Sequence, residues 1–138
     1  MDKETLRELI RQLLEEEDRS CPVKLVKVPS IVISEKDRMD TGDESHFVYT
    51  HDLFSLEESP NLGCGIMEME HTTFPWKLQY DEIDYVISGS LTIYCGEKAV
   101  TAKQGELIFL PKGCEILFST EDQARFLYVT YPADWKNV

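Results

Sequence analysis

The chain has 138 residues, of which 42% are apolar and 29% charged, with a formal net charge of −12 and a pI near 4.6. This length and composition suit one folded domain and exclude wholesale disorder. The acidic balance argues against nucleic acid or an anionic membrane as a partner, because phosphate contacts would form against the protein's own field.

Residues 3–17 predict the clearest helix of the chain. Their apolar side chains recur at helical spacing and form one stripe: Leu6, Leu9, Ile10, Leu13 and Leu14. We expect the helix to end near Asp18, because Pro22 disfavours helix in the residue before it. Since such a helix is marginal alone, we expect it either to pack on its own barrel or a second copy, or to lie in another protein's groove.

The rest of the chain predicts only strands. Alternating or β-branched runs, separated by turn sequences, occur at residues 23–28, 31–34, 46–54, 63–74, 82–88, 90–96, 98–102, 106–111, 115–119 and 124–132. Many short strands without helical pattern between them are typical of a closed barrel or a jelly roll. We therefore predict an amphipathic helix and linker over residues 1–21 and an all-β barrel over residues 22–138.

The cysteines stand singly, without a C-x-x-C pair, at Cys21, Cys64, Cys95 and Cys114. We expect reduced thiols that pack as small hydrophobic groups. The first residues lack the basic and apolar pattern of a signal peptide, and no run is long and apolar enough for a transmembrane helix. These features indicate a soluble intracellular protein with no membrane partner.

Two segments resemble the sequence motifs of cupin barrels. The segment "EIDYVISG" carries Glu82 and Gly89, and "GELIFLPKG" carries Gly105, Pro111 and Gly113. We expect Gly89 and Gly105 to adopt positive φ in tight hairpin turns, and Pro111 with Gly113 to bend the chain at a sheet edge. The resemblance implies a cupin jelly-roll barrel, here with a short N-terminal amphipathic helix.

The histidine ligands of cupin barrels are missing. The family's motif spacing places histidines at positions that this chain fills with Trp76, Leu78 and Ile116. Only Glu82 remains, and a single carboxylate does not hold a divalent transition ion. We therefore expect no transition-metal site.

A closer resemblance, over residues 52–135, is to the C-terminal cupin domain of the EutQ family of ethanolamine-utilisation proteins. It rests on "FPW", "YDEIDYV" and "ARFLYVTYPADW". The resemblance implies a protein of the bacterial cytoplasm, associated with a microcompartment, that acts as an acetate kinase with ATP and Mg²⁺. The N-terminal region is shorter than in longer family members.

The candidate catalytic residues are Glu82 and Asp84. Residues two apart in a strand share a face, so both carboxylates should point into the barrel. Their repulsion in a partly buried site should raise at least one pKa. They could move a proton, hold Mg²⁺ for a phosphate, or only shape the pocket.

Four further side chains are candidate ligand contacts: Trp76, Tyr80, Glu68 and Glu70. The two aromatic residues have the parity of Glu82, but they could equally belong to the core or to a dimer interface. The two glutamates share one face of the preceding strand and could equally face solvent. No phosphate-binding P-loop occurs. The cations near the motifs, Lys77, Lys112 and Arg125, could equally be solvated surface charges.

Two functions remain open from the sequence. The first is a EutQ-like enzyme that uses ATP and Mg²⁺ on a small-molecule substrate, acetate or acetyl phosphate. The second is a non-catalytic assembly or cargo-binding cupin that helix 3–17 targets to the shell or cargo proteins of a microcompartment. In both cases we expect a homodimer.

Overall fold

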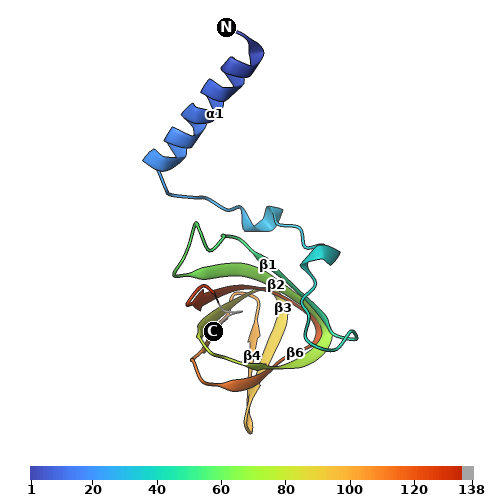
Figure 1. Ribbon diagram of the computed structural model, residues 1–138. Coiled ribbons are helices and arrows are strands. Elements are labelled where there is room, and N and C mark those ends of the chain that lie inside the picture. Colours follow the sequence, from blue (N-terminus) through green and yellow to red (C-terminus); the bar gives the residue numbers. More distant parts are fainter. Residues whose placement is uncertain (135–138) are drawn as a thin grey trace. The chain divides into compact units, whose positions relative to one another are not determined.

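The computed structural model describes residues 1–134, without the side chains of residues 17–20. The chain forms two compact units, Met1–Ile31 and Val32–Val138. The first contains helix α1 (Lys3–Ser20) and the second contains every strand (Figure 1). The predicted helix is confirmed and extends slightly beyond Asp18; the boundary proposed between residues 21 and 22 stays a prediction.

Helix α1 is amphipathic and leaves its apolar stripe open. At its start, the carboxylate of Asp2 accepts a hydrogen bond from the backbone N–H of Thr5, at 2.7 Å, as a helix cap does. The stripe residues Leu6, Leu9, Ile10, Leu13 and Leu14 are 41–61% exposed. Within the described residues, no helix combines the length and the apolar character needed to cross a membrane.

The second unit is an antiparallel sheet whose strands curl into a barrel (Figure 1). Its strands are β1 (Phe47–Asp52), β2 (Gly63–Lys77), β3 (Asp81–Cys95), β4 (Lys98–Lys103), β5 (Leu107–Leu110) and β6 (Glu115–Tyr131). They follow the order β1-β2-β6-β3-β4, and β5 pairs with β3. The all-β prediction is confirmed, and the three long strands β2, β6 and β3 lie side by side at the centre of the sheet.

The predicted strands at 23–28 and 31–34 are wrong. These residues form no strand, and a short 3-10 helix, Val28–Ser30, interrupts them. Pro29 lacks the N–H that a central strand would donate. Val23 and Leu25 are 85% and 82% exposed. The apolar residues of this alternating segment are therefore not buried against a sheet or core.

Gly89 adopts the positive φ that the sequence predicts, but not in a hairpin turn. It lies inside β3 with φ of +75°, next to a shift in the pairing with β6. A Cβ at this position would lie 2.0 Å from the carbonyl oxygen of Gln123. Glycine is therefore required by a strand irregularity and a close backbone approach. Gly105, by contrast, lies in the turn between β4 and β5 with φ of +84°.

The core of the barrel is apolar and aromatic. Stacked rings join the long strands: the centroids of Phe74 and Phe118 lie 5.2 Å apart, and those of Phe118 and Phe126 lie 6.3 Å apart. Each fully buried large side chain stabilises the fold by about 1.5–3 kcal/mol. Any polar group on the inner face of the long strands therefore lies among apolar neighbours.

Candidate functional site

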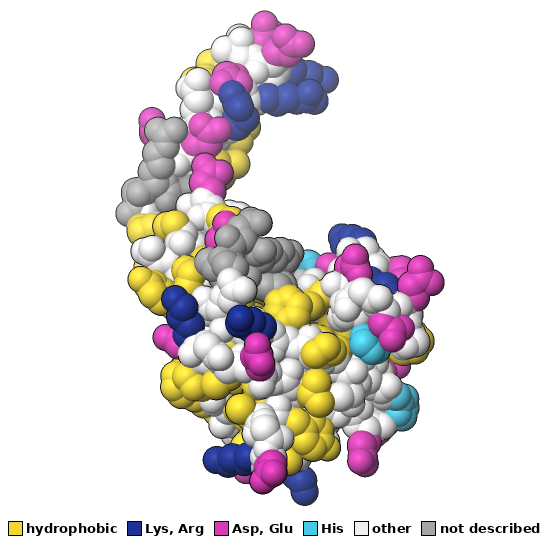
Figure 2. Space-filling view, turned by 60° about the horizontal axis from the view of Figure 1, so that its bottom comes forward, with side chains coloured by type: hydrophobic (Ala, Val, Ile, Leu, Met, Phe, Trp, Pro, Cys, Tyr) yellow, Lys and Arg dark blue, Asp and Glu magenta, His cyan; other side chains and the backbone are white. Residues whose placement is uncertain are grey.

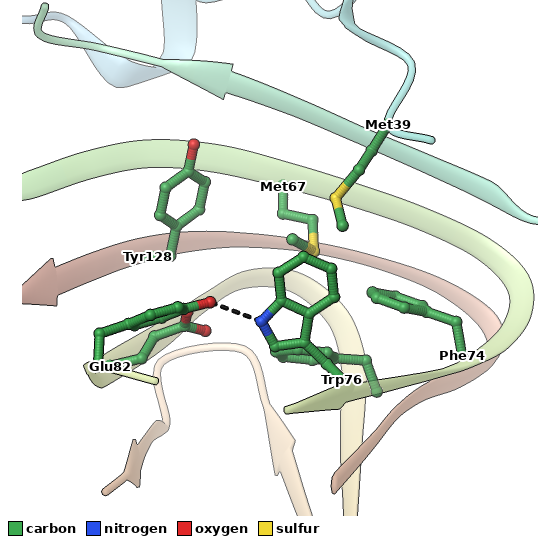
Figure 3. Close-up of a pocket in the computed structure, with 8 residues that line it drawn as sticks. Met39, Met67, Phe74, Trp76, Glu82 and Tyr128 are labelled. Carbon is green, nitrogen blue, oxygen red and sulfur yellow. Dashed lines mark hydrogen bonds between the residues drawn. The ribbon is translucent and has the colours of Figure 1, made fainter. Parts of the chain in front are cut away.

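A cavity inside the barrel brings together side chains from the long strands and from the segment before β1. Its lining residues are Met39, Met67, Phe74, Trp76, Tyr80, Glu82, Phe118 and Tyr128. Figure 3 shows Met39 and Met67 on one side of the indole of Trp76, and Glu82 beside the dashed contact that the indole nitrogen makes. The volume of the cavity open to the centre of a water molecule is about 10 Å³. That space holds about one water molecule.

The inner face of β3 carries the two candidate catalytic carboxylates. Glu82 and Asp84 are 5% and 0% exposed. In the sheet, Asp84 lies between Ile108 of β5 and Tyr128 of β6. The intervening Ile83, at 38% exposed, faces the other way. The strand parity predicted from the sequence is thus confirmed, and it places both carboxylates in the interior.

Most of the oxygens of these carboxylates have no hydrogen-bond partner within the described protein. They are Oε2 of Glu82 and both side-chain oxygens of Asp84. A buried polar group without a partner costs about 1–3 kcal/mol, and a charged one costs more. The barrel therefore retains two unfavourable groups, as is typical of a site that serves a function rather than stability.

Burial changes the acidity of both carboxyl groups. Desolvation raises the pKa of Glu82 to about 7, although its interactions with Asp84 and Tyr80 oppose the rise. Desolvation, and then the neighbouring Glu82, hold the pKa of Asp84 well above its usual range. The sequence predicts that at least one pKa rises, and both do, but burial is the main cause and repulsion within the pair contributes only at Asp84. Near neutral pH the pair therefore retains protons that exposed carboxylates would have released.

Trp76 and Tyr80 join Glu82 in one hydrogen-bonded group. The indole N–H of Trp76 donates to the hydroxyl of Tyr80 at 2.6 Å, the dashed contact of Figure 3. Tyr80 is in turn hydrogen-bonded to Glu82. The turn between β2 and β3 is held by Leu78, whose N–H donates to the carbonyl of Cys114 at 2.9 Å. This backbone contact fixes where the two aromatic side chains enter the cavity.

Glu68 and Glu70 do not join this group. Glu68 pairs with Arg125 of β6 on the outer face of the sheet. Glu70 is exposed, and the intervening Met69 is buried at 1% exposed. The alternative that the sequence left open, a solvent-facing pair with methionines inside, describes their placement.

The candidate cations also lie outside the cavity. Lys77 and Lys112 are exposed, and Arg125 is engaged by Glu68. Lys77, at the end of β2, precedes Leu78 of the turn between β2 and β3, and Lys112 precedes Gly113 in the turn between β5 and β6. A hydrogen bond joins these turns, because the N–H of Gly113 donates to the carbonyl of Leu78 at 2.8 Å. Both lysines therefore belong to one end of the barrel.

Tyr128 is a cavity residue that the sequence interpretation missed. Its hydroxyl donates to the carboxylate of Asp52 at 2.6 Å. Gly65 makes room for it, because a Cβ there would lie 2.1 Å from that hydroxyl. Burial, together with Asp52, holds the pKa of Tyr128 far above its usual range. The alternation of Phe126, Tyr128 and Thr130 in β6 was the available signal for its inward direction.

The site fits a nucleotide–magnesium complex poorly. The unpartnered oxygens of Glu82 and Asp84 are of the hard type that Mg²⁺ prefers. However, no group of three or more metal-ligating side chains occurs among the described residues. Mg²⁺ would also need phosphate or water oxygens, and the cavity admits about one water molecule. A magnesium–phosphate complex therefore does not fit inside the cavity as it is shaped.

Comparison with known protein families assigns the chain to one of them. The family described as "Ethanolamine utilisation protein EutQ" matches residues 1–137. The chain belongs to the EutQ family. A relative from Clostridioides difficile named "Acetate kinase EutQ" is 51% identical over 148 residues, covering 98% of this chain and 94% of the relative. A relative of the same name from Salmonella typhimurium is 40% identical over 97 residues, but the match covers only 42% of that longer protein.

Solved structures support the fold. The structure of the Clostridium difficile EutQ protein matches with a TM-score of 0.81 and 60% identity, covering 83% of each chain. A cupin-2 domain protein from Shewanella frigidimarina matches with a TM-score of 0.53 and 19% identity, over 60% of this chain and 78% of that one. The predicted cupin jelly roll is confirmed.

The buried carboxyl pair predicts a pH-dependent stability. Carboxyl groups with a raised pKa in the folded state stabilise it fully below their unfolded pKa of about 4, and this contribution is lost as pH rises through the folded pKa. Each such group contributes a slope of about 1.4 kcal/mol per pH unit. We expect Asp84→Asn to gain at least about 1 kcal/mol relative to the unchanged protein between pH 5 and pH 7, measured by urea denaturation.

The matched control is Glu97→Gln, which alters an exposed carboxylate in the turn between β3 and β4. It should follow the unchanged protein at every pH. Parallel stability curves for Asp84→Asn and the unchanged protein would show that Asp84 retains no extra proton.

Proposed function

We propose that this chain is an enzyme of ethanolamine utilisation that transfers a phosphoryl group between ATP and acetate. The observation that carries this proposal is the near full-length match to the relative named "Acetate kinase EutQ", at 51% identity. A buried carboxyl pair with raised pKa values, beside a cavity, is the kind of arrangement found at catalytic sites. We propose that Glu82 and Asp84 act there, with Trp76 and Tyr80 as ligand contacts.

The proposed chemistry needs no base. An oxygen of acetate bonds to the γ-phosphorus of ATP, and the bond from that phosphorus to the ADP oxygen breaks. Acetate is already ionised at neutral pH, so no proton has to leave it. Glu82 and Asp84 would therefore contribute to binding and to the local field rather than remove a proton.

The phosphate groups need a place outside the cavity. Phosphoryl transfer requires cations around the transferred group, together with Mg²⁺. Lys77 and Lys112, on neighbouring turns at one end of the barrel, are suitably exposed for that purpose. We propose that ATP with Mg²⁺ binds over this end, where Trp76 also lines a groove with Lys77 and Glu115.

The kinase proposal is tested with acetyl phosphate, ADP and Mg²⁺, by measuring ATP formation. The unchanged protein should form ATP, and Glu82→Leu should lower kcat/KM at least about tenfold because it removes the polar atoms of the site. Glu70→Gln, which alters an exposed glutamate of β2, serves as the control and should retain activity. Absence of magnesium-dependent ATP formation, or full activity in Glu82→Leu, would overturn the proposal.

A second candidate function is assembly on a microcompartment. Helix α1 favours it, because its stripe residues are 41–61% exposed and the helix carries the ion pair of Arg11 with Glu8 at 2.6 Å on a polar surface. An amphipathic helix with an open apolar stripe can lie in a groove of another protein. We propose that α1 docks on shell or cargo proteins and so associates the chain with a microcompartment of the bacterial cytoplasm.

Removal of residues 1–21 tests the docking role of α1. The truncated chain should keep the barrel's thermal unfolding midpoint but lose co-purification with the shell proteins expressed beside it. Leu9→Asp with Leu13→Asp in the full chain should have the same effect, because charges on the stripe oppose its burial. Undiminished co-purification in both variants would contradict this role.

An apolar face of the barrel supports a homodimer. Ile83 of β3 pairs with Phe109 of β5, and Tyr85 pairs with Leu107. All four side chains point outward and are 38–59% exposed. Hydrophobic side chains gather over part of the barrel surface in Figure 2, among scattered charged ones. We propose that this outer face of β3 and β5 packs against the same face of a second copy.

Size-exclusion chromatography with light scattering tests the dimer. Phe109→Glu should convert the dimer to a monomer, because it places a charge at the centre of the apolar face. Leu56→Glu, at a residue that is 49% exposed outside this face, should leave the mass unchanged. A monomeric unchanged protein, or a dimeric Phe109→Glu variant, would contradict the proposed interface.

A further inference from the structure

The cavity has the lining of a cation site rather than of an anion site. Among its lining residues, in the part of the chain that the structure describes, there is no lysine or arginine. The polar groups are the carboxyl of Glu82, the hydroxyls of Tyr80 and Tyr128, and the indole N–H of Trp76, which donates to Tyr80. The protein's net charge of −12 acts in the same direction. A phosphate or carboxylate placed inside would meet carboxyl and hydroxyl oxygens and no compensating cation.

The unpartnered oxygens point to a ligand that donates several hydrogen bonds. Glu82 is 5% exposed, and its Oε2 has no partner within the described protein. Figure 3 shows this side chain beside the dashed phenol–indole contact. Two residues further along β3, both oxygens of Asp84 also lack partners within the described protein. An ammonium group carries three N–H donors and a full positive charge, so it would satisfy these oxygens and offset their charge.

The aromatic lining also favours a cationic ligand. The rings of Phe74, Trp76, Tyr80, Phe118 and Tyr128 all contribute to the cavity wall. The electron-rich faces of such rings attract cations, by about 0.5–2 kcal/mol for a well-placed pair, with Trp the strongest. Met39 and Met67 add apolar, adaptable surface suited to a short carbon tail.

The size of the cavity selects among cations. Room for about one water molecule accommodates an –NH₃⁺ group. A guanidinium or a quaternary ammonium head group is larger than this space, so only the –NH₃⁺ end of a ligand enters it. Mg²⁺ is small enough, but it requires close to six oxygen ligands, and the wall is mainly apolar.

We propose that the cavity binds the –NH₃⁺ group of a small primary ammonium ion, which lies against the Glu82 carboxyl group and beside the Trp76–Tyr80 pair, while its short carbon tail passes Met39 out of the cavity. The ligand class is that of short alkylamines and amino alcohols. The bound cation places a positive charge in the cavity, whose lining carries none among the described residues. The inference does not depend on the kinase proposal, because binding requires neither ATP nor acetate.

The test is isothermal titration of the full-length protein with ethanolamine hydrochloride at constant pH and ionic strength, without nucleotide. Ethylene glycol is the matched ligand control, because a hydroxyl replaces the ammonium on the same carbon chain. Ethylammonium chloride tests whether the second polar group matters. We expect both ammonium salts to bind saturably below about 10 mM and ethylene glycol not to bind.

The variants Glu82→Gln and Asp84→Asn keep the side-chain volumes and remove the ability to ionise. Each should weaken ammonium binding at least about tenfold, whereas Glu70→Gln on the outer face should not change it. Thermal unfolding checks that each variant is folded, and the comparison of ethanolamine with ethylene glycol on the unchanged protein is independent of the variants.

Three results would overturn the inference: equal binding of ethylene glycol and ethanolamine, unchanged ammonium affinity in Glu82→Gln, or no saturable binding of either ammonium salt. Binding of Mg²⁺ without binding of the amines would also overturn it, and would assign the carboxylates to a metal instead. A protein that binds the amine but forms no ATP would contradict only the kinase proposal.

Discussion

The burial of two carboxyl side chains on one face of β3 is the constraint on which the site depends. Glu82 and Asp84 lie two residues apart, so the pleat directs both inward. Asp84 is fully buried between Ile108 and Tyr128 of the flanking strands, and no cationic side chain lines the cavity within the described residues. Desolvation therefore dominates their acidity, and it raises both pKa values. The stability of the fold, the polarity of the cavity and its ligand all follow from how this pair is compensated.

The rest of the site is arranged around this pair by backbone geometry. The turn after β2 is held to the chain before β6 by the bonds of Leu78 with Gly113 and Cys114. This contact brings the indole of Trp76 to the phenol of Tyr80, and the phenol to Glu82. On the other side, Gly65 leaves space for the hydroxyl of Tyr128. A bulkier residue at position 65 would displace the ring of Tyr128 from the cavity wall.

The activity named for the relatives and the chemistry of the cavity call for ligands of opposite charge. Phosphoryl transfer between ATP and acetate needs positive charge around anionic groups. The cavity offers carboxylates and aromatic rings, and the lysines of the same end stand outside it. A small ammonium ion inside the barrel would reconcile the two, because it neutralises the carboxylates and adds positive charge near the exposed lysines. In this arrangement the anionic substrates and the cation occupy different places.

Short-range pattern was sufficient to predict much of this protein from its sequence. The helical repeat predicted α1, and the alternation around Glu82 predicted which face of β3 is buried, since both depend on residues only a few positions apart. Pattern failed at residues 23–28, where alternation occurs without a partner strand, and at Gly89, whose role comes from the approach of Gln123 in β6. It also left open whether Glu68 and Glu70 face the cavity, and it did not reveal Tyr128. Pairing register and the closure of the barrel decided these points, because they bring together residues that are distant in the chain, and only that packing determines which charges lose contact with water.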